Sequence, residues 1–175
     1  MFQKIDKTLI SAAQIEARIE QLAKQIIDDH KDFAEITIVP ILTGAMIFTA
    51  DLIRHMRVPI RINLITVSSY PGTALRTQGA SILGKQLGDI AGRHVLLVDD
   101  ILDSGNTIRA VVPVLQELGA ARVRVAMLLS KNRPEARGAQ VDYVGFDIPD
   151  EFVVGYGLDY DGFYRNLPDI VTLKP

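Results

Sequence analysis

The chain contains no cysteine among its 175 residues. Disulfide bonds, thiolate catalysis and cysteine-ligated zinc sites are therefore excluded, and the composition fits a reducing compartment. No stretch approaches the roughly 20 apolar residues that a membrane-spanning helix needs. Residues 1–10 carry charges at Lys4, Asp6 and Lys7 in place of a long apolar run, so no signal peptide is expected there. We therefore expect a cytoplasmic protein that has no membrane partner.

A surplus of either charge is also lacking. The 19 Lys and Arg residues nearly balance the 21 Asp and Glu residues, which leaves a formal net charge of −2. Such a chain has no long-range positive field, so we expect no nucleic-acid partner. An anionic small molecule would need a local site made from backbone N–H groups, a few basic side chains or a metal ion. The hydrophobic fraction of 48% is enough for one core, and residues 1–175 are predicted to form a single domain.

Apolar segments alternate with amphipathic segments along the chain. Ser11 and Gln14 form a capping box at the start of a helix that is predicted to end at His30. The other expected elements are strands over Ile36–Leu42, Arg61–Val67, His94–Val98 and Val123–Leu129, and helices over Ala45–Met56 and about Thr107–Leu118. This alternation predicts an α/β fold with a mainly parallel central sheet flanked by helices. Ligands of such sheets bind where the strands end. Those ends hold Leu42–Gly44, Asp99–Asp100 and Ser130–Lys131.

The segment from Val95 to Thr107 reads VLLVDDILDSGNT and carries the clearest chemistry. Its apolar strand delivers two carboxylates, Asp99 and Asp100, which can accept hydrogen bonds from sugar hydroxyls, directly or through magnesium. A turn of small residues then leads into a helix, whose free N-terminal N–H groups can bind phosphate. The turn consists of Ser104, Gly105, Asn106 and Thr107. Asp103 lies between the two subsites, where it could meet a reacting group. Although Asp103 could simply cap the helix, the length of the pattern favours a functional interpretation.

The whole thirteen-residue string closely resembles the phosphoribosyl-diphosphate signature of the type I phosphoribosyltransferases. The resemblance implies the fold of that family, with a small hood subdomain built from the N-terminal segment and about residues 140–175. It implies that Asp99 and Asp100 hold the ribose and help to bind Mg²⁺, and that the turn holds the 5′-phosphate. Asp103 would contact substrate beside the turn and act as the general base. Family resemblance also implies a homodimer or homotetramer.

Two further segments resemble the hypoxanthine-guanine enzymes of this family. Thr43 and Gly44 match the loop that contacts diphosphate, although the family often has Lys or Arg where this chain has Thr43. In the family, the peptide bond that corresponds to Leu42–Thr43 is commonly cis. Ser69 and Tyr70 match the Ser-Tyr pair of a mobile lid, and the composition of about residues 68–80, rich in Ser, Gly, Thr and Pro, agrees with a long loop.

The purine pocket of those enzymes also has counterparts in this chain. Lys131 matches the lysine that donates to the purine 6-oxygen. Phe152 would stack on the base, and Val153 would offer backbone groups to its edge. Asp159 would help to bind both the purine and magnesium, and Arg165 matches an arginine that contacts diphosphate.

These resemblances imply transfer of a phosphoribosyl group from phosphoribosyl diphosphate to hypoxanthine or guanine in purine salvage. A cationic donor at Lys131 suits a 6-oxo purine and argues against adenine, but xanthine stays open as a substrate. A phosphoribosyl-diphosphate-sensing regulator of the same fold is a second alternative, against which the acid at Asp103 and the lack of basic surplus argue. A signalling receiver domain, whose first strand resembles Leu96–Asp100, is disfavoured because the preceding part of the chain would need a separate explanation.

Overall fold

The computed structural model describes residues 4–31, 34–68, 81–131, 133–136 and 138–174. The predicted lid residues Ser69 and Tyr70, and most of the predicted mobile loop, lie outside this described part of the chain. The lid therefore stays a prediction.

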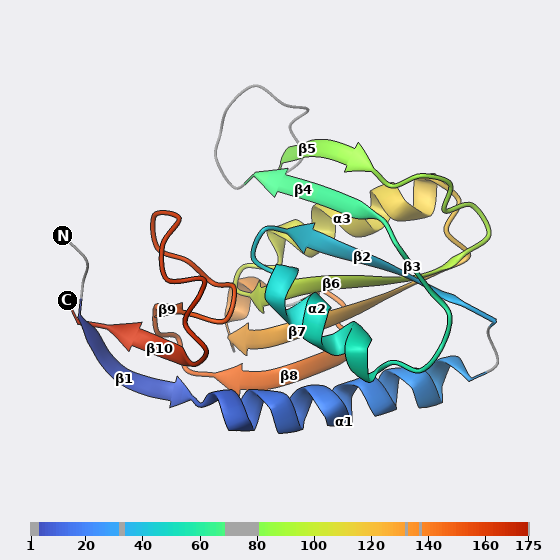
Figure 1. Ribbon diagram of the computed structural model, residues 1–175. Coiled ribbons are helices and arrows are strands. Elements are labelled where there is room, and N and C mark those ends of the chain that lie inside the picture. Colours follow the sequence, from blue (N-terminus) through green and yellow to red (C-terminus); the bar gives the residue numbers. More distant parts are fainter. Residues whose placement is uncertain (1–3, 32–33, 69–80, 132, 137, 175) are drawn as a thin grey trace.

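A seven-stranded sheet forms the centre of the molecule (Figure 1). Its strands are β2 (Ile36–Leu42), β3 (Ile60–Ile62), β4 (Leu64–Ser68), β5 (Ser81–Gln86), β6 (His94–Leu102), β7 (Arg122–Lys131) and β8 (Tyr143–Ile148). The order across the sheet is β5-β4-β2-β6-β7-β8, with β3 paired to the first part of β2. Strand β5 runs antiparallel to β4, and the other pairs in the described sheet are parallel. The prediction of a mainly parallel sheet is confirmed.

Helices cover both faces of this sheet. They are α1 (Ala12–His30), α2 (Met46–His55) and α3 (Asn106–Glu117). A short 3₁₀ helix, η1 (Pro134–Ala136), lies between β7 and β8. Helices α1 and α2 pack on one face and α3 on the other (Figure 1). Because side chains alternate along a strand, β6 contributes Leu96 and Val98 to the core on the α1–α2 face, and Val95 and Leu97 to the core on the α3 face. None of these helices, within the described residues, combines the length and apolar character that a membrane crossing needs.

A smaller antiparallel sheet lies beyond the carboxyl ends of the parallel strands (Figure 1). Its strands are β1 (Ile5–Ile10), β9 (Val153–Val154) and β10 (Ile170–Leu173), in the order β1-β10-β9. The register pairs Ile5 with Leu173 and Val171 with Val154, so segments from opposite ends of the chain meet here. The sheet is built from segments near both ends of the chain, as the expected hood would be, and the hood as a subdomain stays a prediction. Strand β8, which the predicted hood included, is instead the edge strand of the large sheet.

Local signals in the sequence set the helix start but not every strand end. The capping box at α1 is confirmed, because the Ser11 hydroxyl accepts the Gln14 N–H at 3.4 Å and the Gln14 side chain accepts the Ser11 N–H at 2.9 Å. The strand predicted over Arg61–Val67 is divided into β3 and β4, which pair with successive parts of β2. Between them, Asn63 donates its backbone N–H to Ile38 O at 3.0 Å.

Strand β6 continues four residues beyond the predicted end at Val98. It does so because β7 keeps pairing with it as far as Leu102 and Ser130. The two acidic residues Asp99 and Asp100 therefore lie within the strand and are held by its ladder of hydrogen bonds.

Candidate active site

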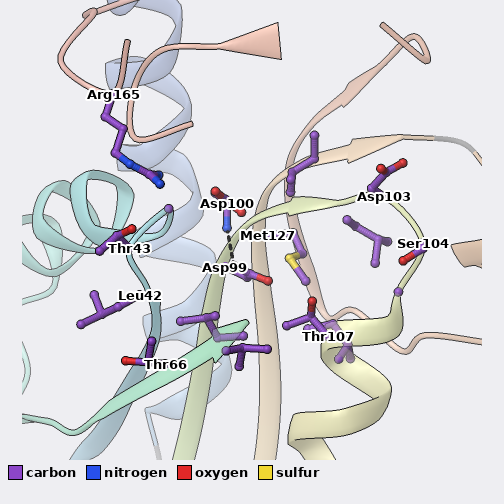
Figure 2. A pocket seen from close by; sticks show the side chains of 17 residues that line it. Leu42, Thr43, Thr66, Asp99, Asp100, Asp103, Ser104, Thr107, Met127 and Arg165 are labelled. Atoms are coloured by element: carbon purple, nitrogen blue, oxygen red, sulfur yellow. Dashed lines mark hydrogen bonds between the residues drawn. The ribbon is translucent and has the colours of Figure 1, made fainter. Parts of the chain in front are cut away.

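A pocket of about 640 Å³ opens at the carboxyl ends of β2, β4 and β6. It extends to the start of α3, and the side chain of Arg165 reaches it from the loop before β10 (Figure 2). Most of the residues singled out in the sequence line it: Thr43, Gly44, Asp99, Asp100, Asp103, Ser104, Gly105, Thr107 and Arg165. Segments that are far apart in the chain thus meet at one site, and its volume suits a small-molecule ligand.

Asp99 and Asp100 bring two carboxyl groups into the pocket. Asp99 is buried, with 6% of its surface exposed, and its Oδ1 accepts the Asp100 backbone N–H at 3.0 Å (Figure 2). Burial raises the pKa of Asp99 well above its usual range, and the neighbouring charge of Asp100 raises it further. Burial also raises the pKa of Asp100, although hydrogen bonds and the positive charge of Arg165 oppose that rise. A ligand that brings a cation or hydroxyl donors would stabilise the ionised pair.

Removal of one of these charges is expected to stabilise the ligand-free protein. Because the pKa of Asp99 is raised by folding, the folded state binds more protons than the unfolded chain, and wild-type stability falls as the pH rises from the ordinary aspartate pKa through the raised one. Asp99→Asn should therefore raise the unfolding midpoint by about 2–4 °C at pH 8 and have little effect near pH 4. Calorimetry across this range measures the difference.

The control for this experiment is Asp28→Asn, at an exposed position of α1. We expect it to leave the pH dependence of the unfolding midpoint as it is in the wild type. An Asp99→Asn midpoint shift of equal size at both pH values would contradict the electrostatic explanation.

Gly44 follows the end of β2 and lies against the Asp100 carboxylate. A Cβ atom at this position would stand 1.8 Å from Asp100 Oδ2, so only glycine leaves room for that side chain. One residue earlier, the Leu42–Thr43 peptide bond is cis, as the resemblance implied. Thr43 brings no charge to this loop, but Arg165 points into the same part of the pocket (Figure 2). Arg165 therefore provides a cation beside the loop.

The turn between β6 and α3 has the features of an anion site. Gly105 is the N-cap residue of α3 and adopts a φ of +75°, a conformation that glycine tolerates best. Gly105 has no side chain that could cap the helix, and the first turn carries no acidic residue. The Ser104 hydroxyl accepts the Asn106 N–H at 3.4 Å. The first N–H groups of a helix have no intrahelical partner, and here they lie next to the pocket residues Gly105 and Thr107, where the helix dipole favours a negative ligand.

Five predicted site residues within the described part of the chain do not line the pocket: Asn106, Lys131, Phe152, Val153 and Asp159. Phe152 is 56% exposed, and its ring packs edge-to-face against Tyr160 with the ring centroids 5.6 Å apart. Val153 is buried in β9 and pairs with β10. Asp159 pairs with Arg165 at 2.6 Å and accepts the Gly162 N–H at 2.8 Å. The purine and metal roles of these residues stay predictions.

Lys131 lies at the end of β7 and belongs to a cluster of four charged groups. Its Nζ is 3.9 Å from Asp103 Oδ1 and 3.4 Å from Asp150 Oδ1. Arg133 joins the same two carboxylates, with Nη1 2.5 Å from Asp103 Oδ1 and Nε 3.1 Å from Asp150 Oδ2. The cluster connects the phosphate turn to the segment that precedes Phe152.

Sequence reasoning missed Arg133 and Asp150. The available signal was their position, because Arg133 is two residues beyond Lys131 and Asp150 is two residues before Phe152. Neither residue type is unusual in a surface loop, and only the folded chain shows that their side chains meet.

Residues 7–161 match the family model described as the phosphoribosyl transferase domain. The chain therefore belongs to the phosphoribosyltransferase family. It is 44% identical to the hypoxanthine-guanine phosphoribosyltransferase of Mycobacterium avium, over 98% of this chain and 87% of that protein. It is 41% identical to the hypoxanthine phosphoribosyltransferase of Salmonella typhimurium, over 93% and 92% of the two chains.

Solved structures agree with this comparison. The hypoxanthine phosphoribosyltransferase of Trypanosoma cruzi, in complex with the product IMP, superposes with a TM-score of 0.90 at 35% identity, over 100% of this chain and 97% of that one. A hypoxanthine-guanine phosphoribosyltransferase of Bacillus anthracis gives a TM-score of 0.88 at 38% identity, over 98% and 100% of the two chains.

Proposed function

We propose that this protein transfers the 5-phosphoribosyl group of phosphoribosyl diphosphate to N9 of hypoxanthine or guanine, which yields IMP or GMP and diphosphate in purine salvage. The observation that carries this proposal is the pocket that joins the Asp99–Asp100 pair, the start of α3 at Gly105 and Thr107, and Arg165. The similarity to hypoxanthine and hypoxanthine-guanine phosphoribosyltransferases over nearly the whole chain supports the proposal.

Each part of the pocket suits one part of phosphoribosyl diphosphate. The carboxylates of the buried Asp99 and the half-buried Asp100 accept hydrogen bonds from the ribose hydroxyls. The N–H groups of the turn from Ser104 to Thr107 hold the 5′-phosphate. Backbone groups at Thr43 and Gly44, together with the guanidinium of Arg165, hold the diphosphate. Catalysis then comes mainly from positioning and electrostatics, because the protein forms no covalent bond with the substrate.

The donor set of the pocket fits a magnesium ion that brings other ligands with it. Within the described residues, no group of three acidic or histidine side chains could hold a metal alone. Asp99 and Asp100 offer two neighbouring carboxyl groups whose pKa values are raised by burial, so a cation would favour their charged form. Mg²⁺ commonly takes one or two carboxylates and completes its shell with substrate oxygens and water. When bound, it neutralises charge on the leaving diphosphate. Asp159 is a further predicted ligand, although Arg165 now occupies it.

The base-binding part of the proposal depends on Lys131, Phe152 and Val153. Lys131 donates to the 6-oxygen, Phe152 stacks on the ring, and the backbone of Val153 meets the base edge. Asp103 takes the proton from purine N7 and must exchange its contact with Arg133 for one with substrate. A xanthine-preferring enzyme remains the second candidate, because the same lysine suits any 6-oxo purine.

A spectrophotometric assay tests the proposed reaction. Purified protein receives phosphoribosyl diphosphate and magnesium with hypoxanthine, guanine, xanthine or adenine, and each mixture is repeated with a chelator. We expect nucleotide formation from hypoxanthine or guanine, none from adenine, and loss of turnover with the chelator. Tight binding of phosphoribosyl diphosphate without turnover of any purine would instead identify a regulator.

We also infer that the protein acts in the cytoplasm as a homodimer or homotetramer. The absence of cysteine supports the location. For the enzyme from Trypanosoma cruzi, one solved structure concerns the effect of the C-terminal region on oligomeric state and activity. Light scattering coupled to size-exclusion chromatography would measure the mass in solution, and a monomer of 19.3 kDa would contradict the inference.

A further inference from the structure

Arg109, in the first turn of α3, turns its side chain back toward the phosphate turn. Its Nη2 donates to Ser104 O at 2.5 Å, to Asn106 Oδ1 at 2.9 Å and to Glu135 O at 3.2 Å. The side chain is partly buried, and it does not line the pocket. Arg109 therefore does not contact a ligand in the pocket, but it holds the backbone of Ser104, which lines the pocket.

We propose that Arg109 is a positioning residue that orients the Ser104–Gly105 peptide for binding of the 5′-phosphate, an inference that rests on the proposed function. In a trans peptide the C=O and the following N–H point in opposite directions. Because the Ser104 carbonyl faces Arg109, outside the pocket lining, the N–H of Gly105 is directed to the opposite side. Ser104 and Gly105 both line the pocket, whereas Arg109 does not, so we infer that the Gly105 N–H faces the pocket.

The close approach of the guanidinium depends on Gly105. A Cβ atom on Gly105 would stand 2.9 Å from Arg109 Nη1 and 2.9 Å from Ala139 Cβ. Glycine therefore serves two purposes here, since it adopts the φ of +75° and leaves room for Arg109. The positive guanidinium next to the helix start also strengthens the local field for an anion.

Arg109 ties the turn to the segment after β7. Arg109 donates to Glu135 O, which lies in η1, and Arg133, just before η1, binds Asp103, the residue that precedes the Ser104–Thr107 turn. One short segment thus contacts side chains on both sides of the turn. All three acceptors lie around Nη2, which shares its two N–H groups among them, and a lysine ammonium on its shorter, flexible stem would not occupy the same position.

The test compares Michaelis constants for the two substrates in Arg109→Gln and Arg109→Lys. For Arg109→Gln we expect the KM for phosphoribosyl diphosphate to rise about tenfold, with the KM for hypoxanthine within about twofold of wild type. The KM of Arg109→Lys for phosphoribosyl diphosphate should lie between those of the wild type and Arg109→Gln, because the charge remains but the ammonium does not reach the position of Nη2. Calorimetric titration with phosphoribosyl diphosphate alone should show the same order of Kd values.

The matched control is Arg124→Gln. Arg124 is likewise a partly buried, hydrogen-bonded arginine, with Nη1 2.5 Å from Asp142 Oδ1, and it lies over the Tyr143 ring and does not line the pocket. Arg124→Gln should leave both KM values unchanged. A role in folding alone would lower thermal stability without separating the two KM values, so equal changes in both, or no change, would overturn the proposal. If Arg109→Gln does not fold, Arg109→Lys provides the same comparison.

The wild-type protein in the same assay distinguishes a failure of the proposed function from a failure of the positioning role of Arg109. Failure of the wild type to turn over any purine would contradict the proposed function. A normal wild-type rate, combined with unselective Arg109 variants, would contradict only the positioning role.

Discussion

Replacement of Asp103 by asparagine is expected to lower kcat with hypoxanthine by about a hundredfold or more, because a positioned general base typically contributes at least that factor. The amide has nearly the shape of the carboxylate and can still accept the hydrogen bond from Arg133 Nη1, so the turn should keep its structure. The KM for phosphoribosyl diphosphate should change much less than kcat. Steady-state kinetics with both substrates varied measures the two effects.

Asp150→Asn is the natural comparison for this variant. Asp150 shares Arg133 and Lys131 with Asp103, so its replacement removes one negative charge from the same cluster without touching the predicted base. We expect kcat to fall less than about tenfold, since this carboxylate only supports the cations. Near-wild-type turnover of Asp103→Asn would show that the base is another group.

Gly44→Ala is expected to lower kcat/KM for phosphoribosyl diphosphate by about a hundredfold or more. The new methyl carbon would stand 1.8 Å from Asp100 Oδ2, well inside contact distance, so either the carboxylate or the loop must move. Displacement of a binding group by about 1 Å can cost about a hundredfold in rate. Because Asp100 is expected to hold the ribose, the loss should appear with every purine tested.

Gly92→Ala adds the same methyl group where no heavy atom lies within 4 Å. Its φ of +71° makes this a test of backbone strain without a clash, at a position outside the pocket lining. Turnover should stay near the wild-type value, even if thermal stability falls. Equal kinetic losses in Gly44→Ala and Gly92→Ala would mean that the contact with Asp100 is not the cause.

Local patterns predicted the parts of the fold that depend on neighbouring residues. The capping box placed the start of α1, and the apolar run placed β2 with its observed bounds, Ile36–Leu42. The end of β6 was misplaced, because continued pairing with β7 extends it through Asp99 and Asp100. Periodicity in one segment carries no information about how far a partner strand continues.

The candidate site, like the fold, has one part that the local sequence predicts and another that depends on tertiary contacts. The phosphate turn and its acids could be found from sequence because they form one continuous string, Val95–Thr107. Arg109 and Arg133 could not, because long side chains reach partners that only the tertiary structure brings near. An arginine two residues beyond a motif looks the same in the sequence whether its guanidinium meets water or a carboxylate.

The segments that we propose to hold the sugar phosphate and those that we propose to bind the base pack on different hydrophobic cores. Leu102 and Ile108, at either side of the phosphate turn, pack on the α3 face of the sheet, whereas Val153 and Leu158 pack on the α1–α2 face. Substitutions that repack one core can therefore accumulate with little effect on the other, since distant sites contribute almost independently. Under the proposed function, the specificity for the base could therefore change, by natural or engineered substitutions, while the binding of phosphoribosyl diphosphate stays the same.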